Sequence, residues 1–392
     1  MSKSTISPLP TLAVVRDFRE EGWPSMDLLA DMLIDQLRTD PRGFTAEEIA
    51  PRFRRVLSAV PGVGRAGASR NFDRLWNRFL TLGRAARTAA TRFDAFHIVD
   101  HSHSHLVHSL PPERTGVCCC DLDTFRCLLE PEKEPRPFWF RAMARRILTG
   151  MQKAAVVFHI SNGTRDGLLT HKLIAPEKLR YLPLGVAPEF SPAPTIAEAQ
   201  SAVQPLGLAD SPYLLHIGSC IPRKRVEFLL KLFAELRHDR PNLLLAKVGD
   251  PWTEAQAASI ERLGIGAAIR HLGRLPRPQL VDVIRAASTV VIPSDAEGFG
   301  LPVVEALACG VPVVASDIPP LREAGGDVAR YAPVGDLARW TEQLAASFAA
   351  ADDPAERNRR REWTSHFTWQ RYASTIADTY RELLDALPNT TG

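Results

Sequence analysis

Short apolar runs alternate with helical patterns along most of this 392-residue chain. Candidate strands occur at residues 12–15, 96–99, 155–158, 214–217, 243–246, 289–292 and 311–315. Between them, apolar residues recur at the spacing of a helix that buries one face, as in 226–236. Strands that alternate with helices form parallel sheets whose two faces are covered by the helices. The pattern therefore predicts an α/β protein.

The length allows two domains, because domains commonly hold 100 to 200 residues. Residues 188–212 contain several prolines and small residues without a clear period, which predicts a linker. We therefore expect a first domain at 1–187 and a second at 213–367. In the remaining segment, 368–392, apolar residues fall on one side of a final helix.

The segment 289–316 predicts a strand, a glycine-rich loop, a helix and a second strand. Gly298 and Gly300 allow a ligand to approach the backbone closely, and Pro302 suits the first turn of a helix. Free N–H groups and the helix dipole favour an anion at such a junction. Glu297 and Glu305 flank this loop, and their carboxylates can accept hydrogen bonds from hydroxyl groups beside a phosphate. A nucleotide sugar offers both groups.

Glu297 to Glu305 resembles the E-x7-E motif of retaining glycosyltransferases of family 4, which have the GT-B fold. The resemblance includes the intervening Gly-Phe-Gly-Leu-Pro and the Glu-Ala-Leu-Ala-Cys-Gly-Val-Pro-Val-Val-Ala that follows. It implies two Rossmann-like, doubly wound domains that face a central cleft. It also implies that the final helix in 368–392 crosses back to the first domain.

The resemblance implies roles for the residues of this motif. Glu297 would hold hydroxyl groups of the donor sugar as the catalytic carboxylate, and Glu305 would accept hydrogen bonds from the ribose. Backbone amides of the loop would approach the sugar and phosphate of the donor, which assigns donor binding to Gly298, Phe299, Gly300 and Leu301.

A second phosphate-binding element is expected at 216–225, between a strand and a helix. Cations at such a junction can neutralise a diphosphate, and the segment resembles the basic loop of the same family. Lys224 falls on the family's lysine, with Arg223 as a second cation. Ser219 stands where many members have arginine, and Arg225 replaces the usual glycine.

Two weaker elements complete the implied donor site. The turn at Arg274 and Leu275 corresponds to the family's nucleobase side, without separating uracil from guanine. Gly22 resembles a loop glycine that lets the first domain approach the donor phosphate, and an ordinary turn explains it almost as well.

Cys120 and Asp121 mark a departure from the family, because many members have His-Asp at this place near the reacting sugar. A thiol is mostly uncharged at neutral pH and replaces an imidazole poorly as a hydrogen-bonding group. We assign both residues to the catalytic group, and Cys120 implies weak activity or altered substrates. Asp121-Leu122-Asp123 also matches a metal-binding D-x-D pattern, which we reject because the nucleotide elements lie far downstream.

Five histidines crowd residues 97–108. A metal site is disfavoured because no suitably spaced cysteine or acidic set completes it. We expect a crowded rim of the active site or histidines that face solvent. No metal and no cofactor are therefore expected, and the nucleotide sugar is the donor substrate.

Charge and cysteine content bound the partners and the compartment. The net charge of +3 gives no indication of a nucleic-acid partner. Basic clusters at 52–55, 84–87 and 141–146 are solvated helix faces or, in a second interpretation, a peripheral contact with anionic lipids.

Three adjacent cysteines fit neither zinc nor a disulfide framework, which favours reduced thiols. Residues 1–4 lack a signal-peptide core and no apolar run approaches a membrane span, so we expect a cytoplasmic protein, with peripheral contact at the inner membrane as the alternative.

The sequence thus predicts a retaining, metal-independent hexosyltransferase that uses a nucleotide-diphosphate sugar. The acceptor would be a saccharide or a lipid-linked saccharide hydroxyl. The alternative is a nucleotide-sugar-binding protein with little or no turnover, suggested by Cys120. A dinucleotide oxidoreductase is a third interpretation, and the absence of a G-x-G-x-x-G after the first strand counts strongly against it. The donor sugar, the base and the linkage stay open.

Overall fold

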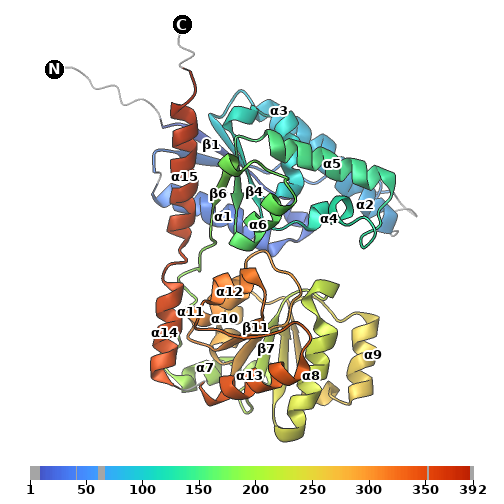
Figure 1. Cartoon of the computed structure of the whole chain (residues 1–392), viewed down its shortest axis with the longest axis vertical. Helices are drawn as coiled ribbons and strands as arrows, with labels where there is room; N and C mark the ends of the chain where they lie inside the picture. The colour runs from blue at the N-terminus through green and yellow to red at the C-terminus, as the bar shows by residue number, and fades with distance from the viewer. Residues whose placement is uncertain (1–8, 41, 61–66, 351–352, 389–392) are drawn as a thin grey trace, which may run out of the picture. The chain divides into compact units, whose positions relative to one another are not determined.

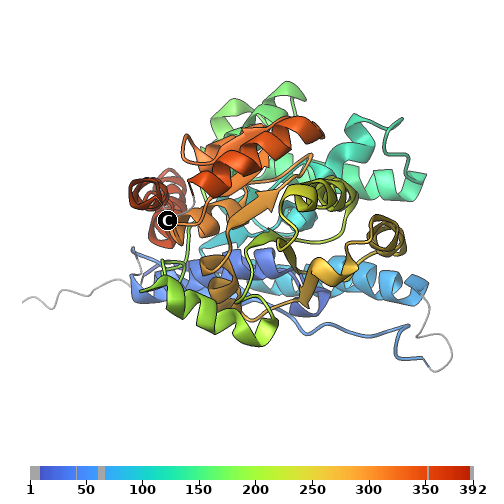
Figure 2. The same ribbon diagram turned by 90° about the horizontal axis from the view of Figure 1, so that it is seen from below.

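The computed structural model describes residues 9–40, 42–60, 67–350 and 353–388. The chain divides into unit one, Met1–Leu184 with Trp369–Gly392, and unit two, Gly185–Thr368. Each unit contains a six-stranded parallel sheet with helices on both faces, as Figure 1 and the end-on view in Figure 2 show. Residues 1–4, which we examined for a signal peptide, lie outside the described ranges.

The sheet of unit one has the strand order β2-β1-β3-β4-β5-β6, with every neighbouring pair parallel. The chain order reverses between β1 and β3, which makes their carboxyl ends the switch point of this sheet. The strands are β1 (Thr11–Val15), β2 (Thr45–Ile49), β3 (Ala95–Ile98), β4 (Thr115–Cys119), β5 (Val156–His159) and β6 (Leu179–Tyr181).

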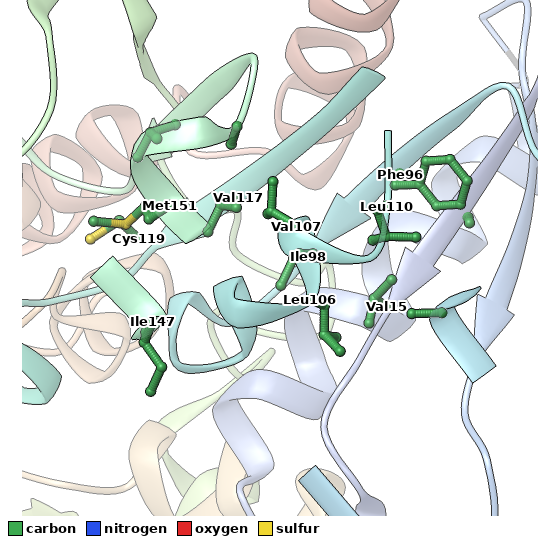
Figure 3. Close-up of a cluster of buried hydrophobic side chains, with 14 of the residues drawn as sticks. Val15, Phe96, Ile98, Leu106, Val107, Leu110, Val117, Cys119, Ile147 and Met151 are labelled. Carbon is green, nitrogen blue, oxygen red and sulfur yellow. The ribbon is translucent and has the colours of Figure 1, made fainter. Parts of the chain in front are cut away.

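Helices cover this sheet and close its core. Figure 3 shows Val15, Ile98 and Val117 from three adjacent strands packing near Ile147 and Met151 of the long helix α5. The helices are α1 (Pro24–Thr39), α2 (Gly67–Trp76), α3 (Leu82–Ala89), α4 (Arg126–Leu129), α5 (Phe138–Lys153), α6 (Asn162–Thr170) and α15 (Trp369–Asp385), with a π-helical turn η2 (Asn77–Thr81) and a 3-10 helix η3 (His101–His108).

The last helix, α15, is anchored in unit one by a buried tyrosine. The hydroxyl of Tyr380 donates to the carbonyl of Phe96 at 2.6 Å and accepts from the N–H of Gly116 at 3.1 Å. A Cβ atom at Gly116 would lie 2.5 Å from this hydroxyl, so only glycine leaves room for it. Helix α15, which is far from β3 and β4 in sequence, thereby bridges these two strands.

The sheet of unit two has the order β12-β11-β10-β7-β8-β9, again entirely parallel. This is the doubly wound order of a Rossmann fold, with its switch point between β7 and β10. The strands are β7 (Tyr213–Ile217), β8 (Leu244–Val248), β9 (Ile269–Gly273), β10 (Thr289–Ile292), β11 (Val313–Ser316) and β12 (Arg330–Ala332).

The helices of unit two begin inside the segment expected as a linker. Within 188–212 the structure has α7, whose Ala199 and Val203 are buried, so the segment packs as part of this unit. The helices are α7 (Ile196–Val203), α8 (Val226–Asp239), α9 (Glu254–Leu263), α10 (Arg277–Arg285), α11 (Leu301–Ala308), α12 (Pro319–Gly325), α13 (Leu337–Ala349) and α14 (Pro354–Thr364). Among the residues described, no helix has the length and apolar character needed to cross a bilayer.

The seven strands expected from apolar runs are all present, as β1, β3, β5, β7, β8, β10 and β11. The strands β2, β4, β6, β9 and β12 were not among the predicted runs. Four of them lie at sheet edges, where pairing on one side tolerates polar residues. The central strand β4 reads Thr-Gly-Val-Cys-Cys, and glycine and cysteine give no strand signal.

Candidate active site

The loops after β7 and β10 meet at the switch point of unit two. These strands are parallel neighbours, so their carboxyl ends lie at the same edge of the sheet. The N–H of Asp295 donates to the carbonyl of Arg223 at 2.8 Å, and Arg223 Nη1 donates to the carbonyl of Ala296 at 2.8 Å. Arg225 Nη1 lies 2.9 Å from Asp295 Oδ1. These contacts hold the two loops in one arrangement.

Glu297 lies at the centre of this arrangement. Its Oε1 accepts from Lys224 Nζ at 2.6 Å and from Ser294 Oγ at 2.7 Å, while its Oε2 lies 3.4 Å from Arg223 Nη1. Burial alone would raise the pKa of Glu297, but the charge of Lys224 and the hydrogen bonds from Lys224 and Ser294 lower it below its ordinary value. The structure thus brings together three predicted donor-site residues as an ionised carboxylate beside two cations.

Arg225, which the sequence has in place of a glycine, adopts a left-handed backbone conformation. Arg225 has φ 49° and stands directly before α8, where the related family usually has glycine. Glycine adopts this region freely, whereas a side chain there is strained. The Arg225 guanidinium contacts Asp295 and lies over the ring of Phe228 at 5.7 Å.

Gly300 shapes the start of α11. Its φ is 114°, and a Cβ atom there would lie 2.9 Å from Leu321 Cδ2, so the loop needs glycine at this position. Beside it, the Phe299 side chain is only 2% exposed and packs edge-to-face on Phe367 at 5.6 Å. Phe299 therefore belongs to the core, and only its backbone can meet a ligand. Gly298 and Leu301, on either side, are half-buried.

Glu305 occupies a different environment from Glu297. It is the fifth residue of α11 and is buried, and burial raises the pKa of Glu305 to about 8. Within the described ranges no hydrogen bond or ion pair joins it to Lys224 or Glu297. The charges that act on it are Arg277 and Glu189, which pair at 2.9 Å. At neutral pH Glu305 is therefore a neutral carboxyl group, able to donate a hydrogen bond as well as accept one.

Lys247 is a buried cation that the sequence analysis did not identify. Its side chain lies in β8 and donates to the carbonyls of Gly218, at 3.3 Å, and Asp250. Burial lowers the pKa of Lys247. Arg274, predicted for the nucleobase side, lies 3.0 Å from Asp250 Oδ1. The sequence signal that could have identified Lys247 was a lysine among the apolar residues of a predicted strand.

Ser219 and Leu275 are two further residues predicted for the donor site. Ser219 follows Gly218 in the loop after β7, and Leu275 follows Arg274 after β9. Both residues are half-buried. They lie at the carboxyl edge of the sheet of unit two, where ligands of such folds bind.

Unit one presents a separate polar group at the carboxyl edge of its own sheet. Asp17 follows β1, Asp100 and His101 follow β3, and Cys120 and Asp121 follow β4. His101 Nδ1 lies 3.4 Å from Asp100 Oδ1, and its Nε2 lies 3.8 Å from Asp121 Oδ1. Burial alone would lower the pKa of His101, but the hydrogen bond with Cys120 and the two carboxylates raise it to about 9.

Cys120 lies beside His101 as a neutral thiol. Its hydrogen bond to Cys118 and its burial raise the pKa of Cys120 well above the usual value. Its Sγ lies 3.9 Å from Met26 Sδ of α1, and its backbone N–H donates to His101 Nδ1 at 3.4 Å. The thiol therefore carries no charge beside Asp121.

The expectation that the histidines of 97–108 face solvent is wrong. His97 is buried within β3, and His101, His103 and His105 are buried because η3 turns them into the core. Ligand atoms of Asp17, Asp100 and His103 lie within 4.8 Å of one another, a spacing that would suit a metal. These groups already interact with protein partners: His103 Nδ1 lies 3.0 Å from Asp17 Oδ1, and Asp100 accepts from the N–H and hydroxyl of Ser102.

Gly22 has a local structural explanation. It ends the 3-10 turn η1 (Arg19–Glu21) with φ 70°, and its N–H donates to the carbonyl of Arg19 at 3.1 Å. A turn of this shape favours glycine whether or not a ligand lies nearby.

Comparison with known proteins gives a family match over one third of the chain. Residues 200–330 match the family described as glycosyl transferases group 1. This range contains Lys224, Glu297 and Glu305. The chain is also 30% identical over 238 residues to O-antigen chain mannosyltransferase B of Escherichia coli, which covers 59% of this chain and 60% of the relative. The match thus spans less than two thirds of the relative's length.

Solved structures show the fold over nearly the whole chain. Sucrose-phosphate synthase from Thermosynechococcus elongatus is 20% identical and has a TM-score of 0.74, covering 96% of this chain and 100% of the other. Anabaena HepE in complex with UDP-glucose is 17% identical with a TM-score of 0.69, covering 96% and 100%. The expected α/β fold with two doubly wound GT-B units is confirmed.

Proposed function

We propose that the chain is a glycosyltransferase that moves a hexose from a nucleotide-diphosphate sugar to a hydroxyl group. The observation that carries this proposal is the group of Lys224, Arg223 and Glu297 at the switch point of unit two, within the range that matches group 1 glycosyl transferases. The UDP-glucose bound by a structural neighbour supports the class of donor. A saccharide or lipid-linked saccharide is the proposed acceptor, in line with the name of the mannosyltransferase relative.

The chemistry follows from the charges at this edge. Departure of a nucleoside diphosphate builds negative charge on its terminal phosphate, and Lys224 and Arg223 oppose that charge. Each such donor commonly stabilises the transition state by roughly 3 kcal/mol. The N–H groups at the start of α11 add to this field. Glu297 would hold donor-sugar hydroxyls while Lys224 and Ser294 keep its carboxylate oriented.

We propose retention of the anomeric configuration without a metal. The bond between sugar C1 and the phosphate oxygen breaks while the acceptor oxygen bonds C1 on the same face. The acceptor proton passes to the departing phosphate oxygen. Trapping a glycosyl adduct on Glu297 would contradict this route, and so would inversion at C1 or a requirement for a divalent cation.

Binding without turnover is the alternative suggested by Cys120. His101 beside Asp121 favours turnover, because its Nε2 lies 3.8 Å from Asp121 Oδ1 and supplies an imidazole where the thiol of Cys120 cannot replace one. Calorimetry with UDP-, GDP- and dTDP-sugars tests the donor site, with Lys224→Ala as the variant that should lose the diphosphate. Binding without release of nucleoside diphosphate to any acceptor would support the alternative. If no nucleotide binds, or if Lys224→Ala binds as well as the wild type, the donor site is misassigned.

A further inference from the structure

Unit two contains a cavity of about 550 Å³ at the amino edge of its sheet, the edge opposite the proposed donor site. Pro212, Ser288 and Pro312 line this cavity, and they stand directly before the parallel strands β7, β10 and β11. Lys224 and Glu297 follow β7 and β10 at the carboxyl edge, and neither lines the cavity. Pockets of roughly 300 to 1,000 Å³ hold small organic ligands. The cavity is therefore a candidate binding site separate from the donor site.

Two arginines of the cavity lining have no carboxylate partner. Arg240 directly follows α8 and Arg357 lies in α14, and within the described ranges neither forms an ion pair. The guanidinium of Arg240 lies over the ring of Phe348 at 4.5 Å. The stem of Arg357 packs on Gly310, where a Cβ atom would lie only 2.5 Å from Arg357 Cγ. Side chains that are placed by packing in this way lose less entropy when they bind an anion.

A third cation is buried next to the same wall of the cavity. Arg360 is 3% exposed, and it donates to the carbonyl of Gly310, a lining residue, at 2.9 Å and to that of Ala350 at 3.2 Å. Among the residues that the structure describes, its Nε has no hydrogen-bond partner and no carboxylate forms an ion pair with it. A buried charge without a counterion is costly, so an anion bound in the cavity would be attracted by Arg360 as well.

The other charged residues of the lining restrict what the rest of a ligand can be. Arg285 donates from Nε to the carbonyl of Ser191 at 2.6 Å and lies 3.7 Å from Asp282, so its groups are engaged within the protein. Asp210 is exposed and forms no ion pair in the described part of the chain. Its carboxylate repels an anion and accepts hydrogen bonds from hydroxyl groups. A ligand that carries an anionic group and separate hydroxyl groups fits both kinds of charge.

We propose that this cavity binds a small organic phosphate that carries hydroxyl groups. Arg240 and Arg357 pair with the phosphate, because the planar guanidinium matches the spacing of phosphate oxygens. A phosphate monoester carries about −1.5 to −2 charges at neutral pH and so balances two arginines, which a single carboxylate does not. Asp210 accepts from the hydroxyl groups, and Phe348 and Ile196 of the lining contact the carbon atoms. This inference goes beyond the proposed transfer reaction, since none of these residues belongs to the donor site.

Calorimetry with the full chain tests the proposal. The probes are glycerol 3-phosphate and sorbitol 6-phosphate, compared with inorganic phosphate and with sorbitol. We expect both organic phosphates to bind, inorganic phosphate to bind more weakly and sorbitol not to bind. R240M/R357M keeps the stems that pack on Phe348 and Gly310 but removes both charges. Because a hydrogen bond to a charged group commonly contributes a factor of about ten or more, this variant should bind the organic phosphates at least about tenfold more weakly.

Two controls make the test specific to the cavity. Lys224→Ala removes a cation of the donor site, which could also attract a phosphate, and should leave the binding of sorbitol 6-phosphate unchanged. K231M/R361M removes two exposed charges of unit two outside the cavity lining and should bind as the wild type does. A loss in Lys224→Ala but not in R240M/R357M would place the phosphate at the donor site and overturn the proposal. No binding to the wild type would overturn it too, as would equal losses in K231M/R361M and R240M/R357M.

Asp210→Asn provides a test that does not depend on the folding of R240M/R357M. This exposed position tolerates the change, and the amide removes the repulsion between the carboxylate and a phosphate. Inorganic phosphate should therefore bind more tightly to Asp210→Asn than to the wild type. Unchanged binding of inorganic phosphate, including no binding to either protein, would overturn the proposed site. Equal affinities of the wild type for inorganic phosphate and sorbitol 6-phosphate would overturn the assignment of an organic ligand.

Discussion

Replacing Glu305 by glutamine tests the conclusion that this buried carboxyl group is neutral. The ordinary pKa of a glutamate is 4.5, and burial raises the pKa of Glu305 to about 8 in the folded protein. Between pH 4.5 and pH 8, Glu305 of the folded protein holds a proton that the same residue of the unfolded chain has released. The free energy of unfolding therefore falls as pH rises, by about 1.4 kcal/mol per pH unit for this group. Between pH 5 and pH 8 the loss amounts to about 3 kcal/mol.

Glu305→Gln removes this titration while keeping the shape of the side chain. The amide can change packing by an amount that does not depend on pH. Beyond that constant, the free energy of unfolding of the variant should increase relative to that of the wild type as pH rises from 5 to 8. Urea unfolding of both proteins at several pH values measures this difference in free energy, and the contributions of the other titrating groups cancel because both proteins share them. Glu261→Gln, on an exposed position of α9, is the control and should run parallel to the wild type. Parallel curves for Glu305→Gln as well would refute the neutral carboxyl group.

Three further substitutions test other parts of the structure. Gly300→Ala places a Cβ atom at a left-handed position and 2.9 Å from Leu321 Cδ2, so it should destabilise unit two by about 2 kcal/mol, measured by thermal unfolding; an unchanged melting temperature would contradict the loop geometry. Tyr380→Phe leaves the buried carbonyl of Phe96 and the N–H of Gly116 without their partner, so it should lower the free energy of unfolding in urea by about 1–3 kcal/mol. A loss below the experimental error would mean that α15 does not pack against β3 and β4 in this way. His101→Gln removes a histidine whose pKa is raised to about 9, so its protonation stabilises the fold fully below pH 6.5 and this contribution is lost as pH rises through 9. The stability deficit of the variant relative to the wild type should therefore shrink between pH 6.5 and pH 9. A deficit that stays constant over this range would argue against a protonated His101.

The local structure of the proposed donor side was largely predictable from the sequence, because its signals are local. A β-branched strand, a glycine-rich loop and a helix start follow one another within 289–308, and the structure has β10, the loop and α11 there. The basic segment at 222–225 lies in the same position after β7. Parallel pairing of β7 with β10 then brings Lys224 to Glu297. Their meeting was implied by the family resemblance and follows physically from the strand order.

The protonation states could not be read from the sequence. Glu297 and Glu305 are the same residue type eight positions apart, yet one is ionised between cations and the other is neutral. The difference depends on burial and on which side chains surround each carboxyl group, from the loop after β7 for Glu297 and from α10 for Glu305, and packing decides both. The histidines of η3 illustrate the same limit, since a polar and crowded segment turned out to be buried.

The sequence by itself determined the α/β class, most of the strands and the segments that form the proposed donor site, because periodicity and glycine placement act within short stretches of chain. The tertiary structure alone decided which charges are paired. It placed Lys247 beneath the loop after β7, set His101 between two carboxylates and fastened the 52–58 loop to α2. Pairing and burial depend on residues distant in sequence, and the free energy of a charge depends on that environment far more than on its neighbours along the chain.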